Sequence, residues 1–228
     1  MKNVKGVPVI VPAILAKNRA EFVKKLKQME SVADLVQVDV MDGRFVPNTT
    51  WHSTKDVARI KTKLLFELHL MVQNPLPIVT DWMKVKGLRR VIFHAESPVR
   101  LADMIREARE RCLEVGIAIS PKTSLKQIIP YRSRIDLVLV MGGEPGFSGK
   151  QLDYNTIDTV RAIRKKSKKI LIGFDIGVSR ETIPTLVRAG VTHLCAASAV
   201  FKAKSPKKEV GVLERIARRV WRGEGLEV

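Results

Sequence analysis

The sequence has few cysteines and no long apolar run. Its two cysteines, Cys112 and Cys195, have no partner at metal-ligand spacing, so both are expected to pack as small hydrophobic residues. Nothing indicates an oxidising compartment. No apolar run approaches the roughly 18 residues that span a bilayer, and residues 1–12 are too short and too rich in valine and proline for a secretory signal. These absences predict a cytoplasmic protein without a membrane partner.

Acidic and aromatic residues are also scarce. The chain has 41 Lys and Arg against 23 Asp and Glu, which gives a net charge of +18. Such an excess attracts anions, either nucleic acid or a phosphorylated metabolite. The basic residues recur on helical segments such as 165–169, which is typical of a solvated outer surface. At 5% the aromatic content is too low for a platform that stacks single-stranded nucleic acid. The composition therefore argues against a nucleic-acid partner.

Short apolar segments alternate with amphipathic helical segments along all 228 residues. The apolar segments are rich in Val, Ile and Leu without strict alternation, as expected of strands buried on both faces. Eight strand–helix units without a linker predict an α/β fold, a (β/α)8 TIM barrel that forms one domain over residues 1–228, with a frayed tail after about residue 222. The expected strands are 7–14, 35–40, 64–71, 90–94, 116–120, 137–141, 170–175 and 193–197. The expected helices are 19–31, 54–61, 77–85, 98–115, 125–129, 154–166, 180–189 and 208–222.

An open, doubly wound sheet is the alternative architecture. That fold needs a glycine-rich phosphate turn directly after its first strand. The sequence there is Pro12-Ala13-Ile14-Leu15, which contains no glycine. The closed barrel is therefore the favoured prediction.

Polar residues stand at the C-terminal ends of several expected strands, where barrel enzymes carry their active sites. Asp39 and Asp175 end the second and seventh strands, and His69 lies near the end of the third. Gln37 precedes Asp39 by two residues and so lies on the same strand face. Carboxylate, imidazole and amide oxygen suit a divalent metal such as Zn, Fe, Mn or Co. The alternative is that each residue only caps or hydrogen-bonds a strand end, but three of them on different strands favour a metal site.

Short turns, two of them with glycine, follow the last three expected strands. In barrels, turns at this place commonly bind phosphate together with the N-terminus of a short helix. A short helix beginning near Ser198 is expected to point free N–H groups at such an anion. Ordinary tight turns would also explain the glycines, but their place after the final strands favours a phosphate site. The turn residues are Gly146, Phe147, Ser148 and Gly149, then Ile176 and Gly177, then Ala197 and Ser198.

Several strings of residues resemble the ribulose-phosphate 3-epimerase family. The most specific is 38–48, Val-Asp-Val-Met-Asp-Gly-Arg-Phe-Val-Pro-Asn, and 68–72, 93–96 and 141–149 also match. The likeness runs in order from about residue 11 to 201. It implies a barrel of the ribulose-phosphate-binding type and an isomerase. The implied reaction is a metal-dependent 1,1-proton transfer that interconverts D-ribulose 5-phosphate and D-xylulose 5-phosphate at C3 through a cis-enediolate.

The resemblance also implies a role for each site residue. Asp39 and Asp175 match the two bases, one of which removes the C3 proton while the other returns a proton to the opposite face. His69 matches a metal ligand that also lies near substrate, and the metal disperses the charge of the enediolate. The methionines matched to the surroundings of the enediolate are Met41, Met71 and Met141.

The chain departs from the family pattern within this same set of residues. Gln37 stands where the family has histidine, which is expected to weaken metal binding or to shift the preference toward harder metals. Ala13 replaces a serine that contacts substrate. Ile176 and Gly177 stand where the family has two glycines, so a side chain is expected to crowd the phosphate, at a residue where a positive φ would be costly. Ala197 likewise replaces a glycine.

These departures leave three functions open. The chain is either a divergent epimerase, or an epimerase of another ketose phosphate, or a catalytically impaired barrel that binds a phosphorylated ligand or polyanion. A phosphorylated ketose is the substrate in the first two cases, and the sequence leaves a homo-oligomer open. Among the remaining residues, His94 is expected to satisfy a polar network, and His193 has no indicated partner. Three tryptophans in or near helical segments, Trp51, Trp82 and Trp221, are expected to be packing residues.

Overall fold

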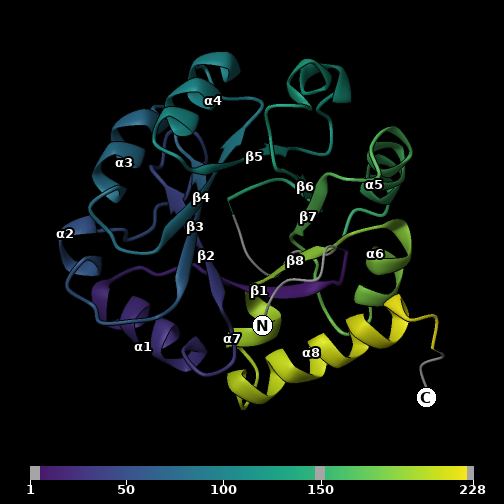
Figure 1. Ribbon diagram of the computed structural model, residues 1–228. Coiled ribbons are helices and arrows are strands. Elements are labelled where there is room, and N and C mark those ends of the chain that lie inside the picture. The colour runs from purple at the N-terminus through teal and green to yellow at the C-terminus, as the bar shows by residue number, and fades with distance from the viewer. Residues whose placement is uncertain (1–5, 147–151, 225–228) are drawn as a thin grey trace.

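The computed structural model describes residues 6–146 and 152–224. Eight parallel strands pair in sequence order and close into a barrel. Figure 1 looks along the barrel, with the strands inside and the helices around them. The predicted (β/α)8 barrel is confirmed, and the doubly wound alternative is wrong. The strands are β1 Val9–Ile14, β2 Leu35–Met41, β3 Leu65–Met71, β4 Leu88–His94, β5 Glu114–Ile119, β6 Leu137–Met141, β7 Leu171–Asp175 and β8 His193–Ala196.

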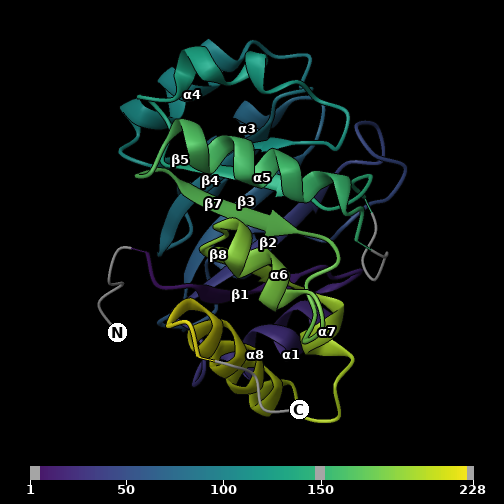
Figure 2. The same ribbon diagram turned by 90° about the vertical axis from the view of Figure 1, so that its right-hand side faces the viewer.

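Helices join successive strands on the outside of the barrel, and Figure 2 shows α4, α5, α6 and α8 along that outer surface. Two short 3-10 turns, η1 Leu125–Gln127 and η2 Ile129–Tyr131, stand between β5 and β6, where a helix over 125–129 was expected. Pro130 is the second residue of η2 and has no N–H to continue a helical ladder. The helices are α1 Arg19–Met29, α2 Thr54–Val57, α3 Pro75–Trp82, α4 Leu101–Glu110, α5 Asn155–Lys166, α6 Ile183–Ala189, α7 Ser198–Phe201 and α8 Pro206–Trp221.

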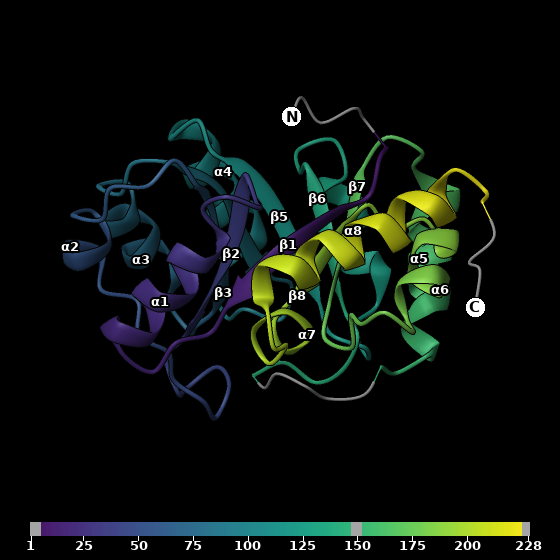
Figure 3. The same cartoon turned by 90° about the horizontal axis from the view of Figure 1, so that it is seen from below.

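Side chains alternate between the two faces of each strand, and this alternation divides the core into two layers. In β3, Phe66, Leu68 and Leu70 pack into the layer between strands and helices, where the ring of Phe66 meets Trp82 at 5.9 Å. The residues between them point into the barrel, because successive side chains of a strand face opposite ways. Figure 3 shows α8 lying across the outside of β1, which closes this outer layer where the chain ends. The inward residues therefore form a separate interior, which reaches the mouth of the barrel.

Three local predictions are wrong. The expected helix 98–115 ends at Glu110, and β5 begins at Glu114, because the apolar residues of the strand continue the helical spacing. Cys112 lies in the turn between them, exposed and with φ 59°, and does not pack as a hydrophobic residue. Trp221 ends α8 with 47% of its surface exposed, although Trp82 is fully buried as expected.

Within the described residues, no helix is both long enough and apolar enough to cross a membrane.

Candidate active site

Strand register brings the candidate residues together at the C-terminal mouth of the barrel. Asp39 of β2 is paired with His69 of β3, and Asp175 of β7 is paired with Met141 of β6. Because all strands are parallel, their C-terminal ends meet at one end of the barrel. Residues far apart in the sequence therefore share one small volume.

The two aspartates are bridged by two side chains. The Nε2 atom of Gln37 donates to Oδ1 of Asp39 and to Oδ2 of Asp175, both at 2.8 Å. The Nδ1 atom of His69 lies 3.0 Å from Oδ1 of Asp39 and 3.4 Å from Oδ2 of Asp175. All four side chains are buried. The cluster thus presents two carboxylates that share the same two neighbours.

A histidine relay leads from the cluster to the rim of the barrel. The Nε2 atom of His69 is 2.9 Å from Nε2 of His94, and Nδ1 of His94 is 3.0 Å from Glu96. Glu96 also accepts hydrogen bonds from the backbone of Ser120 and from the hydroxyl of Thr123. The prediction that His94 satisfies a polar network is confirmed. The network holds the imidazole of His69 in place from behind.

Burial and charge set the protonation of this cluster. Burial raises the pKa of Asp39, because a carboxylate loses its hydration there, although hydrogen bonds from His69 and Gln37 oppose the shift. Burial by itself lowers the pKa of His69, but Asp175 and Asp39 outweigh it and raise the pKa to about 9. Burial lowers the pKa of His94 despite its bond to Glu96. A cation placed between the two aspartates is therefore stabilised, whether it is an imidazolium or a metal ion.

The donor set fits a divalent metal. Ligand atoms of Asp39, His69 and Asp175 lie within 4.8 Å of one another. A neutral His69 that donates from Nε2 to His94 presents Nδ1 to the aspartates as a ligand. The Oε1 atom of Gln37 is buried without a hydrogen-bond partner in the structure. Rotation of the amide would turn that oxygen toward the carboxylates, a position that is favourable only with a cation between them.

A pocket opens over the cluster and collects most of the predicted residues. Gln37 and Ala13 do not line it: they are paired on β2 and β1, and both are fully buried. Phe147, Ser148 and Gly149 lie outside the described residues. Predicted residues that line the pocket are Asp39, Met41, His69, Met71, Met141, Gly146, Asp175, Ile176, Gly177, Ala197 and Ser198; Leu15, Val178 and Cys195 also line it.

The turn after β7 carries an unusual backbone conformation. Ile176 has φ 71° although it is not glycine, and the following Gly177 has φ 78°. A β-branched residue with a positive φ is strained, so the backbone at Ile176 carries the energetic cost that such a conformation implies. The expected short helix near the eighth strand is confirmed, since α7 begins at Ser198.

Sequence reasoning missed a second polar cluster deeper in the barrel. Glu67 of β3 is fully buried, and its two oxygens meet His193 and Arg90, each at 2.8 Å. The sequence indicated no partner for His193, and the structure shows that Glu67 is one. The available signal was the position of Glu67, two residues before His69 and therefore on the same inward face.

These features define a class of protein. A (β/α)8 barrel with two carboxylates and an imidazole converging at its mouth has the parts of a metal-assisted acid–base enzyme. The model of the ribulose-phosphate 3-epimerase family matches residues 9–201. The chain belongs to that family, as its motifs indicated.

Individual relatives agree over nearly the whole chain. It is 34% identical to the ribulose-phosphate 3-epimerase of Mycobacterium tuberculosis over 219 residues, which cover 93% of this chain and 94% of the relative. It is 33% identical to the enzyme of Schizosaccharomyces pombe over 215 residues, 90% of this chain and 91% of the relative. A solved structure, 3-keto-L-gulonate-6-phosphate decarboxylase of Vibrio cholerae, superposes with a TM-score of 0.71 at 14% identity, covering 94% and 99% of the two chains. That last likeness concerns the fold alone.

Proposed function

We propose that the chain epimerises D-ribulose 5-phosphate and D-xylulose 5-phosphate at C3. The observation that carries the proposal is the pair Asp39 and Asp175, held at the mouth by shared bonds to Gln37 and His69. Two carboxylates on opposite sides of a flat intermediate are what inversion of one carbon requires. Family membership with relatives named ribulose-phosphate 3-epimerase supports the same reaction.

Proton transfer in this proposal belongs to the two aspartates. One carboxylate takes the proton from C3 and the other returns a proton to the opposite face of the cis-enediolate. Burial, which raises the pKa of Asp39, makes its carboxylate a stronger base than a solvated one. Asp39, His69 and Asp175 would hold a divalent ion such as Zn, Fe, Mn or Co, which supplies positive charge to the enediolate oxygens.

Other lining residues would orient and shield the substrate. Gly146 and Gly177 in turns and Ser198 at the start of α7 border the pocket on the side of the last three strands, which supports their assignment to the phosphate. The methionines Met41 and Met71 close the pocket with apolar surface, so water is kept from the enediolate. Ile176 narrows the phosphate end, where the family pattern has glycine.

Replacement of either aspartate tests the proposal. Asp39→Asn and Asp175→Asn are each expected to abolish interconversion, because an amide cannot accept the C3 proton. Turnover and exchange of the C3 proton with deuterated solvent are measured after metal is supplied. Asp158→Asn serves as a matched control, since Asp158 lies on α5 and bonds only to Arg161 among the described residues. Full activity in either site variant contradicts the assignment.

The same measurements distinguish the alternatives. A wild-type protein that exchanges protons with a ketohexose 6-phosphate but not with the pentulose is an epimerase of another ketose phosphate. A protein that exchanges neither, with metal bound, is an impaired barrel, for which Ile176 and Gln37 are the structural reasons. Its cytoplasmic location, single-domain organisation and any homo-oligomer stay predictions.

A further inference from the structure

A second set of metal-ligating side chains lies in the barrel interior, outside the cluster of Asp39, His69 and Asp175. We call it the floor cluster: Glu67 from β3, with His193 and Cys195 from β8. One carboxylate oxygen, one imidazole nitrogen and the thiol sulfur lie within 4.8 Å of one another. All three residues are buried, and the proposed reaction uses none of them. The cluster therefore combines oxygen, nitrogen and sulfur donors in the buried interior of the barrel.

The carboxylate of Glu67 is held in position by Arg90, a residue outside the floor cluster. One guanidinium nitrogen of Arg90 donates to Oε2 of Glu67 at 2.8 Å, and the other donates to Glu114 at 2.5 Å. The remaining oxygen of Glu67, Oε1, faces Nε2 of His193 at 2.8 Å. Metal-binding carboxylates are typically held in this manner, with one oxygen on an outer partner and the other on the ion. Arg90 thus leaves Oε1 as the ligand atom.

We propose that Glu67, His193 and Cys195 form a second metal site, selective for zinc. Thiolate and imidazole are preferred ligands of zinc, and the sulfur separates this site from the oxygen-rich cluster at the mouth. The floor site is independent of the epimerase proposal, because none of its ligands belongs to the acid–base pair. The floor site binds a soft or borderline metal ion, whereas the cluster of Asp39, His69 and Asp175 at the mouth also suits harder metal ions.

Charge balance makes the buried ion acceptable. A zinc ion enters as the thiol proton of Cys195 and the proton shared by His193 and Glu67 leave. The carboxylate of Glu67 and the thiolate of Cys195 then offset the two charges of the dication, while Arg90 lies between Glu67 and Glu114, and Glu114 also pairs with Arg89 at 2.8 Å. A buried charge needs such compensation. The Nε atom of Arg90 is also buried without a hydrogen-bond partner in the structure. It could donate to one further oxygen atom in the floor cluster.

The pocket at the mouth provides the route of entry. Cys195 lines that pocket together with Asp39, His69 and Asp175, so its sulfur is the point where the floor cluster meets the mouth. An ion that reaches the mouth meets the thiol next. No opening of the strand ladder is required, since the ligands come from the inward faces of strands that are already in place.

Cobalt provides the test, because thiolate ligation gives Co(II) a charge-transfer absorption in the near ultraviolet that oxygen and nitrogen ligands do not. The metal-free full-length protein is titrated with Co(II), and the near-ultraviolet absorption is recorded. In a second titration with zinc, the number of zinc ions bound per protein molecule is measured. We expect two equivalents of zinc and a charge-transfer band in the wild type. Cys195→Ser and His193→Gln should each lose one equivalent, and Cys195→Ser should lose the band. Asp39→Asn should keep the band.

Cys112→Ser is the matched control, because the other cysteine lies exposed in the turn before β5. It should keep both the band and the second equivalent. Absence of the band in the folded wild type, or its loss in Cys112→Ser instead of Cys195→Ser, overturns the site. An unchanged zinc count in Cys195→Ser does the same. Thermal unfolding of each variant without metal shows that the fold is intact, and Cys195→Ala is the second variant if serine destabilises it.

Discussion

At the scale of single residues, Gln37 links the two aspartates at the mouth of the barrel. Its amide donates to both aspartates while its buried oxygen has no partner in the structure. An unsatisfied buried acceptor costs on the order of 1–3 kcal/mol. That cost favours any state in which Oε1 gains a partner, and a cation between Asp39 and Asp175 is one. A histidine at the same position would offer a stronger ligand to zinc without needing to rotate.

Replacement of Gln37 by histidine is therefore expected to tighten zinc binding at the mouth. Even outer partners of a metal site contribute 10–100-fold in affinity, so a direct ligand should contribute at least about tenfold. Calorimetric titration with zinc measures this, in a Cys195→Ser background so that thiolate ligation is removed. Gln37→Ala is the comparison and should not tighten binding. Equal affinities for the histidine variant and its parent would place Gln37 outside the metal shell.

At the scale of elements, the ends of β6 and β7 approach each other closely where the pocket forms. The backbone N–H of Gly142 donates to the carbonyl of Asp175 at 2.6 Å. A Cβ at Gly142 would overlap the carbonyl oxygen of Ile176 and the ring of Phe174. The strained turn at Ile176 therefore packs closely against Gly142, the residue directly after β6.

Gly142→Ala is expected to destabilise the protein by about 2 kcal/mol, as overpacking of a rigid backbone does. Gly211→Ala, inside α8, is the matched control: its new methyl group meets only the end of Arg215, at 3.6 Å. That change should stabilise by roughly 0.5–1 kcal/mol, because alanine is the better helix former. Urea unfolding followed by tryptophan fluorescence measures both. If Gly142→Ala leaves the free energy of unfolding unchanged, the turn after β7 moves freely.

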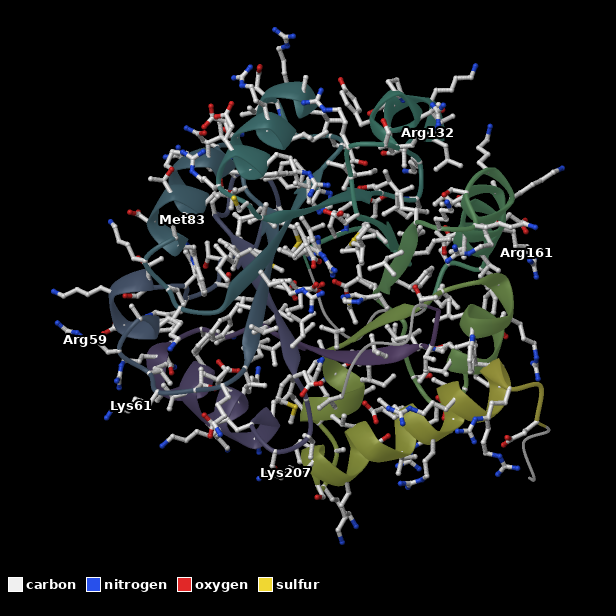
Figure 4. The ribbon with its side chains drawn as sticks, viewed as in Figure 1. Arg59, Lys61, Met83, Arg132, Arg161 and Lys207 are labelled. Carbon is white, nitrogen blue, oxygen red and sulfur yellow. The ribbon has the colours of Figure 1, made fainter. Side chains whose placement is uncertain are left out.

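At the scale of the whole molecule, charge governs the response to acid. The outer helices carry much of the net charge of +18. Figure 4 shows basic side chains that point outward from the molecule: Arg59, Lys61, Arg132, Arg161 and Lys207. At the rim of the barrel, the partly exposed carboxylate of Glu96 has several hydrogen-bond partners. Burial would raise the pKa of Glu96, but bonds from His94, Thr123 and Ser120 lower it to about 2.

Acid should therefore lower the stability of the folded protein between about pH 4.5 and pH 2. The ordinary pKa of a glutamate is 4.5, so below that pH the unfolded chain binds a proton at Glu96 that the folded chain still excludes. The stability that Glu96 contributes is complete above pH 4.5 and is lost as the pH falls toward 2. Urea midpoints across this range measure it. Glu96→Gln should lower stability at pH 7 and flatten the acid decline; a parallel decline in both proteins would contradict the assignment.

The sequence by itself determined the barrel and the two aspartates. Eight apolar segments alternating with helical ones leave few other folds, and parallel strands bring their C-terminal ends together, so Asp39 and Asp175 had to meet at one end. Local strings of residues also indicated the family.

Only the tertiary structure decided the rest. The floor cluster joins Glu67 of β3 to His193 of β8, two strands that meet across the barrel interior and share no ladder. The orientation of the Gln37 amide and the left-handed φ of Ile176 follow from the neighbours that surround them. Local pattern sets which face a side chain takes, but contacts across the barrel depend on closure, shear and packing of all eight strands. No spacing along the chain encodes them.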